Sequence, residues 1–128
     1  MEKSRGSNLR TRTKIFAVSV VRFASELPRK QEFLVIGKQL MRCGTSVGAN
    51  YRAACRAKSR ADFVAKMAIV EEEADEAVYW LEIIEALTTQ SSNQLTRLKS
   101  EANALVAIVV ASKKTARMNG LRTNVGRS

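Results

Sequence analysis

The chain contains no histidine, only two cysteines, one proline and few aromatic residues, which make up 5% of its 128 positions. Without histidine, a Cys-His nucleophile and the Glu-x-x-His pattern of di-iron helix bundles are both excluded. The usual ligands of a zinc site are missing as well, because the chain also has no Cys-x-x-Cys pair. We therefore predict no catalytic residue, no metal site and no cofactor.

The two cysteines, Cys43 and Cys55, are predicted to share one helix. Their separation of twelve positions corresponds to about 18 Å along the helix axis, whereas a disulfide requires Cα atoms within about 7 Å. We expect both to be free thiols that pack as small apolar side chains. The sequence also shows no secretory signal and no run of roughly 18 uncharged apolar residues. These features together predict a cytoplasmic protein with no membrane span.

Basic residues outnumber acidic ones by 22 to 12, which gives a formal net charge of +10. Such a surplus favours polyanionic partners through counterion release. The basic residues gather near both termini and around the middle of the chain, whereas the acids gather between Glu71 and Glu85. The candidate contacts to nucleic-acid phosphates are Arg52, Arg56, Lys58, Arg60, Lys113, Lys114 and Arg117. The alternative is that these side chains are solvated and only keep the protein soluble.

Apolar residues recur at helical spacing over most of the chain, and no strand-like alternation competes with this pattern. One such stripe, predicted to be buried, consists of Phe33, Ile36, Leu40, Val47, Tyr51 and Ala54. The pattern predicts an all-α protein, an antiparallel up-down-up-down four-helix bundle over residues 9–118. We place the helices at about 11–26, 31–57, 60–87 and 93–118. Residues 1–8 are predicted to be a disordered basic N-terminus, and residues 119–128 a flexible tail.

Local signals support these boundaries. Leu27-Pro28 ends the first helix, because proline disfavours a helical conformation in the residue before it. Ser59 and Asp62 have the spacing of an N-cap and its reciprocal acid, which starts the third helix. Gly44 and Gly48 are unfavourable inside a helix, so they indicate either a close approach of another backbone or a local irregularity of the helix.

The third helix carries carboxylates on an otherwise apolar stripe, and these need partners if they are buried. We predict a buried polar network of Ser46, Asn50, Glu73 and Glu76, with an arginine as a further candidate partner. A metal site using Glu72, Glu73 and Glu76 is the alternative, which the lack of histidine disfavours.

One segment is distinctive enough to carry a family resemblance. It is Ser46-Val47-Gly48-Ala49-Asn50-Tyr51-Arg52, followed by the acidic run Glu71-Glu72-Glu73-Ala74-Asp75-Glu76. Together they resemble the bacterial four-helix-bundle family also called 23S rRNA intervening-sequence proteins, over about Thr11 to Ala116. The Leu-x-Val-Trp opening of many family members is absent from this chain.

The resemblance implies an antiparallel four-helix bundle that assembles as a ring, a homopentamer. It also implies kinship with the accessory variability determinant proteins of diversity-generating retroelements, which bind nucleic acid and a reverse transcriptase. It brings no established enzymatic activity and no catalytic residues. The name of the family records where its genes were found.

Charge pattern and resemblance together predict a non-enzymatic, homo-oligomeric basic bundle that binds RNA or DNA with little sequence specificity. Its expected partners are further copies of itself, RNA or DNA and, by family analogy, a protein such as a reverse transcriptase. The alternative is a protein-interaction adaptor or scaffold with no role in nucleic-acid binding.

Overall fold

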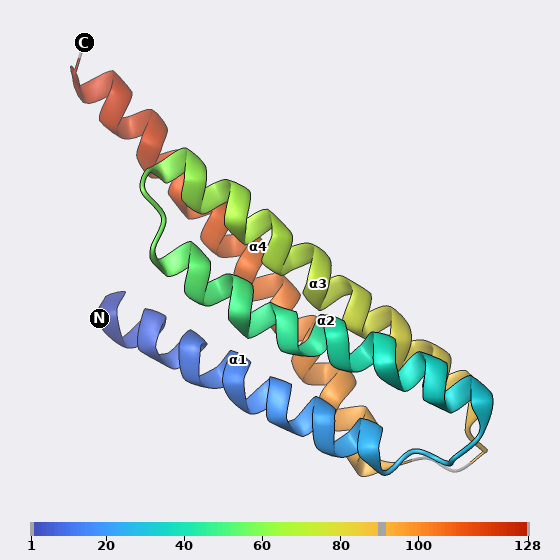
Figure 1. Cartoon of the computed structure of the whole chain (residues 1–128). Coiled ribbons are helices and arrows are strands. Elements are labelled where there is room, and N and C mark those ends of the chain that lie inside the picture. Colours follow the sequence, from blue (N-terminus) through green and yellow to red (C-terminus); the bar gives the residue numbers. More distant parts are fainter. Residues whose placement is uncertain (1, 90–91, 128) are drawn as a thin grey trace.

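The computed structural model describes residues 2–89 and 92–127, with side chains for residues 8–89 and 92–120. In these residues the chain forms the helices α1 (Glu2–Ser25), α2 (Gln31–Cys55), α3 (Arg60–Leu87) and α4 (Asn93–Arg127), and no strand. Successive helices run in opposite directions (Figure 1). Each packs along the next, and α4 closes the bundle by a sparser contact with α1. The predicted all-α, up-down-up-down four-helix bundle is confirmed.

The outer ends of the bundle differ from the boundaries that we predicted. Helix α1 begins at Glu2 and α4 continues to Arg127, so both helices are longer than the predicted 11–26 and 93–118. Met1 and Ser128 lie outside the described residues. No proline interrupts either extension, and each of the glycines there, at positions 6, 120 and 126, costs only about 1 kcal/mol in a helix interior. Asn119-Gly120 is therefore too weak a signal to end α4.

The inner boundaries fall within two residues of the prediction, the usual uncertainty of helix ends. The amide of Asp62 donates to the Ser59 hydroxyl at 3.0 Å, and its carboxylate accepts from the Lys58 amide at 3.1 Å. This reciprocal cap starts α3 at the predicted position. Ser92 caps α4 in a similar way, accepting from the amide of Leu95 at 3.3 Å.

One apolar core runs the length of the bundle. The stripe that we predicted on α2, with Leu40 and Val47 at its centre, is buried. It meets fully buried side chains from each of the other helices: Phe16, Val20, Met67, Leu81, Ile84, Leu105 and Val109. Because the spacing of these residues follows the helical repeat, every helix presents one apolar face to this core. The short connections between successive helices make neighbours antiparallel.

Helices α1 and α2 approach each other closely at two glycines. A Cβ added at Gly44 would lie 2.7 Å from a methyl carbon of Val20, and one added at Gly48 would lie 3.2 Å from the Thr13 hydroxyl oxygen. The close approach predicted from these glycines is confirmed. The lack of a side chain at both glycines leaves room for α1 to pack closely against α2.

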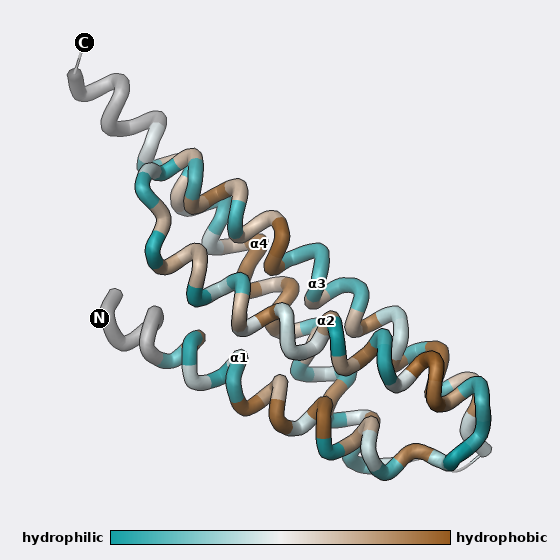
Figure 2. Tube along the Cα trace, in the orientation of Figure 1, coloured by the Kyte–Doolittle hydropathy of each residue, from teal (hydrophilic) through white to brown (hydrophobic). Residues whose placement is uncertain are grey.

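Apolar side chains also remain on the outer surface of the single chain. Ile15, Val18 and Val21 of α1 are 61%, 42% and 41% exposed. Leu34 and Val35, at the start of α2, are each 56% exposed. Figure 2 shows brown segments along the middle of α1, where apolar residues are concentrated. Within the described residues, none of the helices has the combination of length and apolar composition required to cross a bilayer.

Candidate nucleic-acid interface

The basic residues near the start of α1, around the α2–α3 turn and in the second half of α4 meet at one end of the bundle. There α1 begins, α2 ends, α3 begins, and α4 passes beyond the α2–α3 turn (Figure 1). The turn itself carries exposed Lys58 and Arg60, and hydrophilic colours cover this part of the chain in Figure 2. On α4, Lys114 and Arg117 are exposed near the same end. The up-down topology therefore converts separate basic stretches of sequence into one basic end.

A groove of about 530 Å³ lies between α1 and α2 at this end. Arg10 and Lys14 line it from α1, and Arg52 and Arg56 line it from α2. All four side chains are exposed, and no carboxylate is among the residues that line the groove. In the part of the chain whose side chains are described, none of these four cations forms an ion pair. The groove is thus a strongly positive recess that is open to a ligand.

The helical repeat and small residues together shape this groove. Each helix contributes two cations four positions apart, which places both on the same side of that helix. The floor between the two rows consists of small side chains, among them Ala17, Thr45, Gly48 and Ala49. Because these residues fill little space, the long basic side chains stand at the rims of a real depression.

The sequence alone identified two of the four cations that line the groove. Arg52 and Arg56 were predicted nucleic-acid contacts, and the structure places both in it. Arg10 and Lys14 belong to the basic start of the chain, but the sequence did not single them out as contacts, although their spacing of four was a usable signal. Only the pairing of α1 with α2 shows that these two rows face the same groove.

The other predicted contacts are distributed around the groove. Arg60 reaches across to α4, where its Cδ would stand 3.2 Å from a Cβ added at Gly120. Lys58, Lys114 and Arg117 are exposed, but they do not line the groove. These residues extend the positive surface without forming part of the recess.

Lys113 has a different role from the one that we predicted. Its amine lies 2.6 Å from the Glu71 carboxylate, and its side chain is only 14% exposed. Since position 113 of α4 faces α3, Lys113 forms an ion pair that links these two helices. It is therefore not free to contact a phosphate, unlike its neighbour Lys114.

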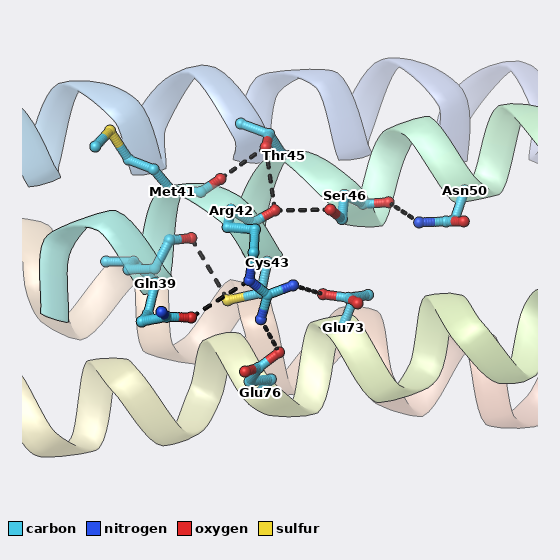
Figure 3. A network of polar contacts seen from close by, with 10 residues as sticks. Gln39, Met41, Arg42, Cys43, Thr45, Ser46, Asn50, Glu73 and Glu76 are labelled. Carbon is cyan, nitrogen blue, oxygen red and sulfur yellow. Dashed lines mark hydrogen bonds and ion pairs between the residues drawn. The ribbon is translucent and has the colours of Figure 1, made fainter. Parts of the chain in front are cut away.

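The predicted network of Ser46, Asn50, Glu73 and Glu76 is only partly present. Arg42 of α2 binds both glutamates of α3, with 3.2 Å between its Nη1 and Glu73, and its Nη2 donates to Glu76 (Figure 3). Of the partners predicted for the two glutamates, only an arginine is observed in contact with them. The cluster is not buried, because the side chains of Arg42, Glu73 and Glu76 are 48%, 20% and 36% exposed.

Ser46 and Asn50 do not join the glutamates. The Ser46 hydroxyl donates to the Arg42 carbonyl at 2.7 Å, and the Asn50 amide donates to the Ser46 carbonyl at 2.8 Å (Figure 3). Both side chains bond to the preceding turn of their own helix, as short polar side chains in helices commonly do. Polar residues at helical spacing on two neighbouring helices therefore did not imply one shared hydrogen-bond network.

The Arg42 cluster and the neighbouring Cys43 offer no reactive group. Its hydrogen bond with Glu76 raises the pKa of Arg42 further above its ordinary value. Next to it, burial and then the Glu76 charge raise the pKa of the Cys43 thiol from 9.0 to about 12. A protonated thiol and a charged ion pair offer no nucleophile. No group of three or more His, Cys, Asp or Glu residues that could hold a metal ion occurs in the part of the chain that the structure describes.

Comparison with known proteins places the chain in a family. A family profile described as "23S rRNA-intervening sequence protein" matches residues 7–111. The chain belongs to the 23S rRNA-intervening sequence protein family. The resemblance drawn from the sequence is confirmed. All four cations of the groove fall inside the part of the chain that this family profile covers.

A solved structure supports the same family assignment. It is a crystal structure of a protein with unknown function from the S23 ribosomal protein family of Bacteroides thetaiotaomicron, with 32% sequence identity and a TM-score of 0.78. The match covers 85% of this chain and 97% of the other. No curated protein matches the chain. Neither the description of the 23S rRNA-intervening sequence family nor that of the Bacteroides protein names an enzyme.

Proposed function

We propose that this chain is a non-enzymatic, homo-oligomeric basic bundle that binds RNA or DNA with little sequence specificity. The observation that carries the proposal is the groove in which Arg10, Lys14, Arg52 and Arg56 meet without a carboxylate. Each of these side chains can pair with a phosphate oxygen, and Arg does so in a bidentate manner. The exposed Lys58, Lys114 and Arg117 add long-range attraction around it.

Low specificity follows from the residues that line the groove. None of them is aromatic, so the groove cannot stack bases, which is the usual additional source of affinity in single-strand binding. Arginine and lysine contacts to phosphates position a strand but do not read its sequence. The expected ligand is therefore the backbone of a nucleic acid, whatever its bases.

The exposed apolar residues support assembly with further copies of the chain. Ile15, Val18 and Val21 form an outer face of α1 that the described residues leave largely or partly exposed. Burying such a face against a second copy removes apolar surface from water, at roughly 25 cal/mol per Å². A ring built from one repeated contact would also present the basic groove several times, which raises the avidity for a long strand. A protein of this kind would act in the cytoplasm, where nucleic acid is accessible.

Fluorescence anisotropy with a labelled oligonucleotide tests the proposal. We expect binding at about 50 mM salt and a logarithmic affinity that falls linearly with the logarithm of the salt concentration. Oligonucleotides of different sequence should give similar affinities. Lack of association with RNA and with DNA at the lower salt would contradict the proposal. Pull-down before and after nuclease treatment would then test a protein adaptor, whose partner should persist after the nuclease.

A further inference from the structure

We propose that the α1–α2 groove is a single-strand site that holds three consecutive phosphates of an RNA or DNA backbone. The inference rests on the proposed function and names the ligand that this site takes. Its basis is the order of the four cations along the groove, which the contact between the two helices determines.

The contact between Thr13 and Gly48 sets the register of the groove. A Cβ at position 48 would stand 3.2 Å from the Thr13 hydroxyl oxygen, so these two residues lie at the same level. Lys14 follows Thr13 directly and shares this level. Because the helices are antiparallel, Arg10 and Arg52 lie together one turn closer to the basic end. Arg56 lies one turn further still.

The cations are therefore arranged in three steps along the groove: Lys14, then Arg10 with Arg52, then Arg56. Four helical residues advance by about 6 Å, so neighbouring steps are about 6 Å apart. This step is comparable with the separation of neighbouring phosphates along an extended single strand. A backbone lying in the groove would meet a cation at every phosphate.

The width of the groove favours a single strand over a duplex. Packed helices lie 8–10 Å apart, so the recess between α1 and α2 admits one backbone, whereas a double helix would rest on its rims. A groove of about 530 Å³ is within the size range of sites for small ligands, and it holds only a short segment of a strand.

The arrangement also costs the protein stability in the absence of an anion. Arg10 and Lys14 are like charges four positions apart on one helix, and so are Arg52 and Arg56. Such pairs destabilise a helix, and here the two pairs also face each other across the groove. A row of phosphates removes both repulsions, which gives the ligand a direct energetic reason to bind here.

Charge-removing variants with a matched control test the site. We would measure anisotropy with a short labelled oligouridylate for the wild type, for Arg52→Gln/Arg56→Gln and for Arg29→Gln/Lys30→Gln. The control pair is exposed at the opposite end of the bundle and changes the net charge by the same amount. Removing two phosphate contacts should weaken binding roughly 10- to 100-fold at about 50 mM salt and reduce the salt slope by about 1.4. The control should change neither quantity by more than a small fraction of this.

A second pair of variants tests the floor of the groove. Ala49→Glu places a carboxylate between the four cations, at an exposed helical position that accepts glutamate. Ala65→Glu adds the same charge at an exposed position of α3, outside the groove. We expect Ala49→Glu to abolish most of the binding and Ala65→Glu to retain it, with unchanged helicity in both proteins.

Different outcomes separate the site from the general proposal. If the groove variants and their controls lose affinity equally, the whole surface binds and the assigned site is wrong, while nucleic-acid binding stands. If the wild type binds no oligonucleotide, the proposed function itself is wrong. Titration with inorganic phosphate and with a blunt duplex of equal length completes the test, since binding of either as tightly as the single strand would overturn the single-strand assignment. A DNA oligonucleotide should bind like its RNA counterpart, because the contacts involve only phosphates.

Discussion

Thr13 of α1 rests directly on Gly48 of α2, so closely that a Cβ at position 48 would stand 3.2 Å from the Thr13 hydroxyl oxygen. The Thr13 side chain is buried, and its hydroxyl donates to the Arg10 carbonyl at 3.1 Å. This contact fixes the separation and the register of the two helices that bear the basic groove. The glycines of α2 therefore link the packing of the bundle to the geometry of its candidate binding site.

Substituting the α2 glycines should produce a graded series in stability. A Cβ at Gly44 would meet the Val20 methyls at 2.7 and 3.0 Å, and Val20 is fully buried and stiff. We expect Gly44→Ala to lower the free energy of unfolding by about 1–2 kcal/mol, the net of overpacking and of improved helix propensity. Gly48→Ala should have a smaller effect, because Thr13 lies further away. Urea denaturation measures both changes.

Gly37→Ala is the matched control for this series. The nearest atoms to its new Cβ, those of Leu27 and Ala24, are at 3.5 and 3.9 Å, which is ordinary contact. With no clash, the gain in helix propensity should raise the free energy of unfolding by about 0.5–1 kcal/mol. Equal effects of Gly37→Ala and Gly44→Ala would contradict the close packing of α1 on α2.

The contact between α1 and α4 should depend on one ion pair. The Arg12 guanidinium donates to both oxygens of Glu101, at 2.7 and 2.8 Å, in the sparsest helix contact of the bundle. We expect Glu101→Gln to increase hydrogen exchange of backbone amides in the first half of α1. Glu85→Gln, which removes the Lys99 partner between α3 and α4, should leave α1 unchanged. Equal exchange in both variants would mean that α1 is held by its contact with α2 alone.

The two thiols should differ sharply in reactivity. Cys43 is buried and Cys55 is exposed, and the pKa of Cys43 is raised to about 12 by burial. Because the thiolate is the reactive form, an aromatic disulfide reagent at about pH 8 should label one thiol per folded chain and two in denaturant. Cys55→Ser should abolish labelling of the folded protein. Rapid reaction of Cys43 in that variant would show that the core around it opens readily.

Cys43 should also reduce the stability of the protein at high pH. Its folded pKa of about 12 lies above its ordinary value of 9.0, so the folded state retains a proton that the unfolded chain releases. The resulting stabilisation is complete below pH 9 and is lost as the pH rises towards 12, at up to about 1.4 kcal/mol per pH unit.

Denaturation of the wild type and of Cys43→Ala at two pH values measures this loss. We expect the free energy of unfolding to fall less in the variant between about pH 8 and pH 10.5. Tyr51, whose pKa is also raised to about 12, is present in both proteins and therefore cancels in the comparison. Identical slopes would mean that the Cys43 thiol does not titrate differently on folding.

The sequence was sufficient to predict the fold because the signals for it are local or periodic. The spacing of Leu40 and Val47 predicts a buried stripe, and the Ser59 cap predicts the start of α3; both are confirmed. Helices α1 and α4 extend beyond their predicted ends, since a polar composition and isolated glycines do not by themselves end a helix. Helical spacing also carries no information about depth, which is why Glu73 was expected to be buried and is instead partly exposed.

The candidate site was harder to predict because it depends on which helices are neighbours. Arg52 and Arg56 were chosen for their position near the middle turn, but only the register of α1 against α2 adds Arg10 and Lys14. Lys113 and Lys114 are adjacent in sequence, yet one is paired with Glu71 and the other is free to contact a ligand. Consecutive residues of a helix point in directions about 100° apart, so Lys113 and Lys114 face different neighbours. Which of the two is paired can be predicted only when the surrounding helices are known.

Light scattering coupled to size-exclusion chromatography, with and without a single-stranded oligonucleotide, tests the central claim most directly. We predict a mass of several chains that takes up the oligonucleotide at about 50 mM salt and releases it at about 300 mM, as phosphate contacts require. A particle of the same mass with and without oligonucleotide at the lower salt would contradict the claim that this basic bundle binds nucleic acid.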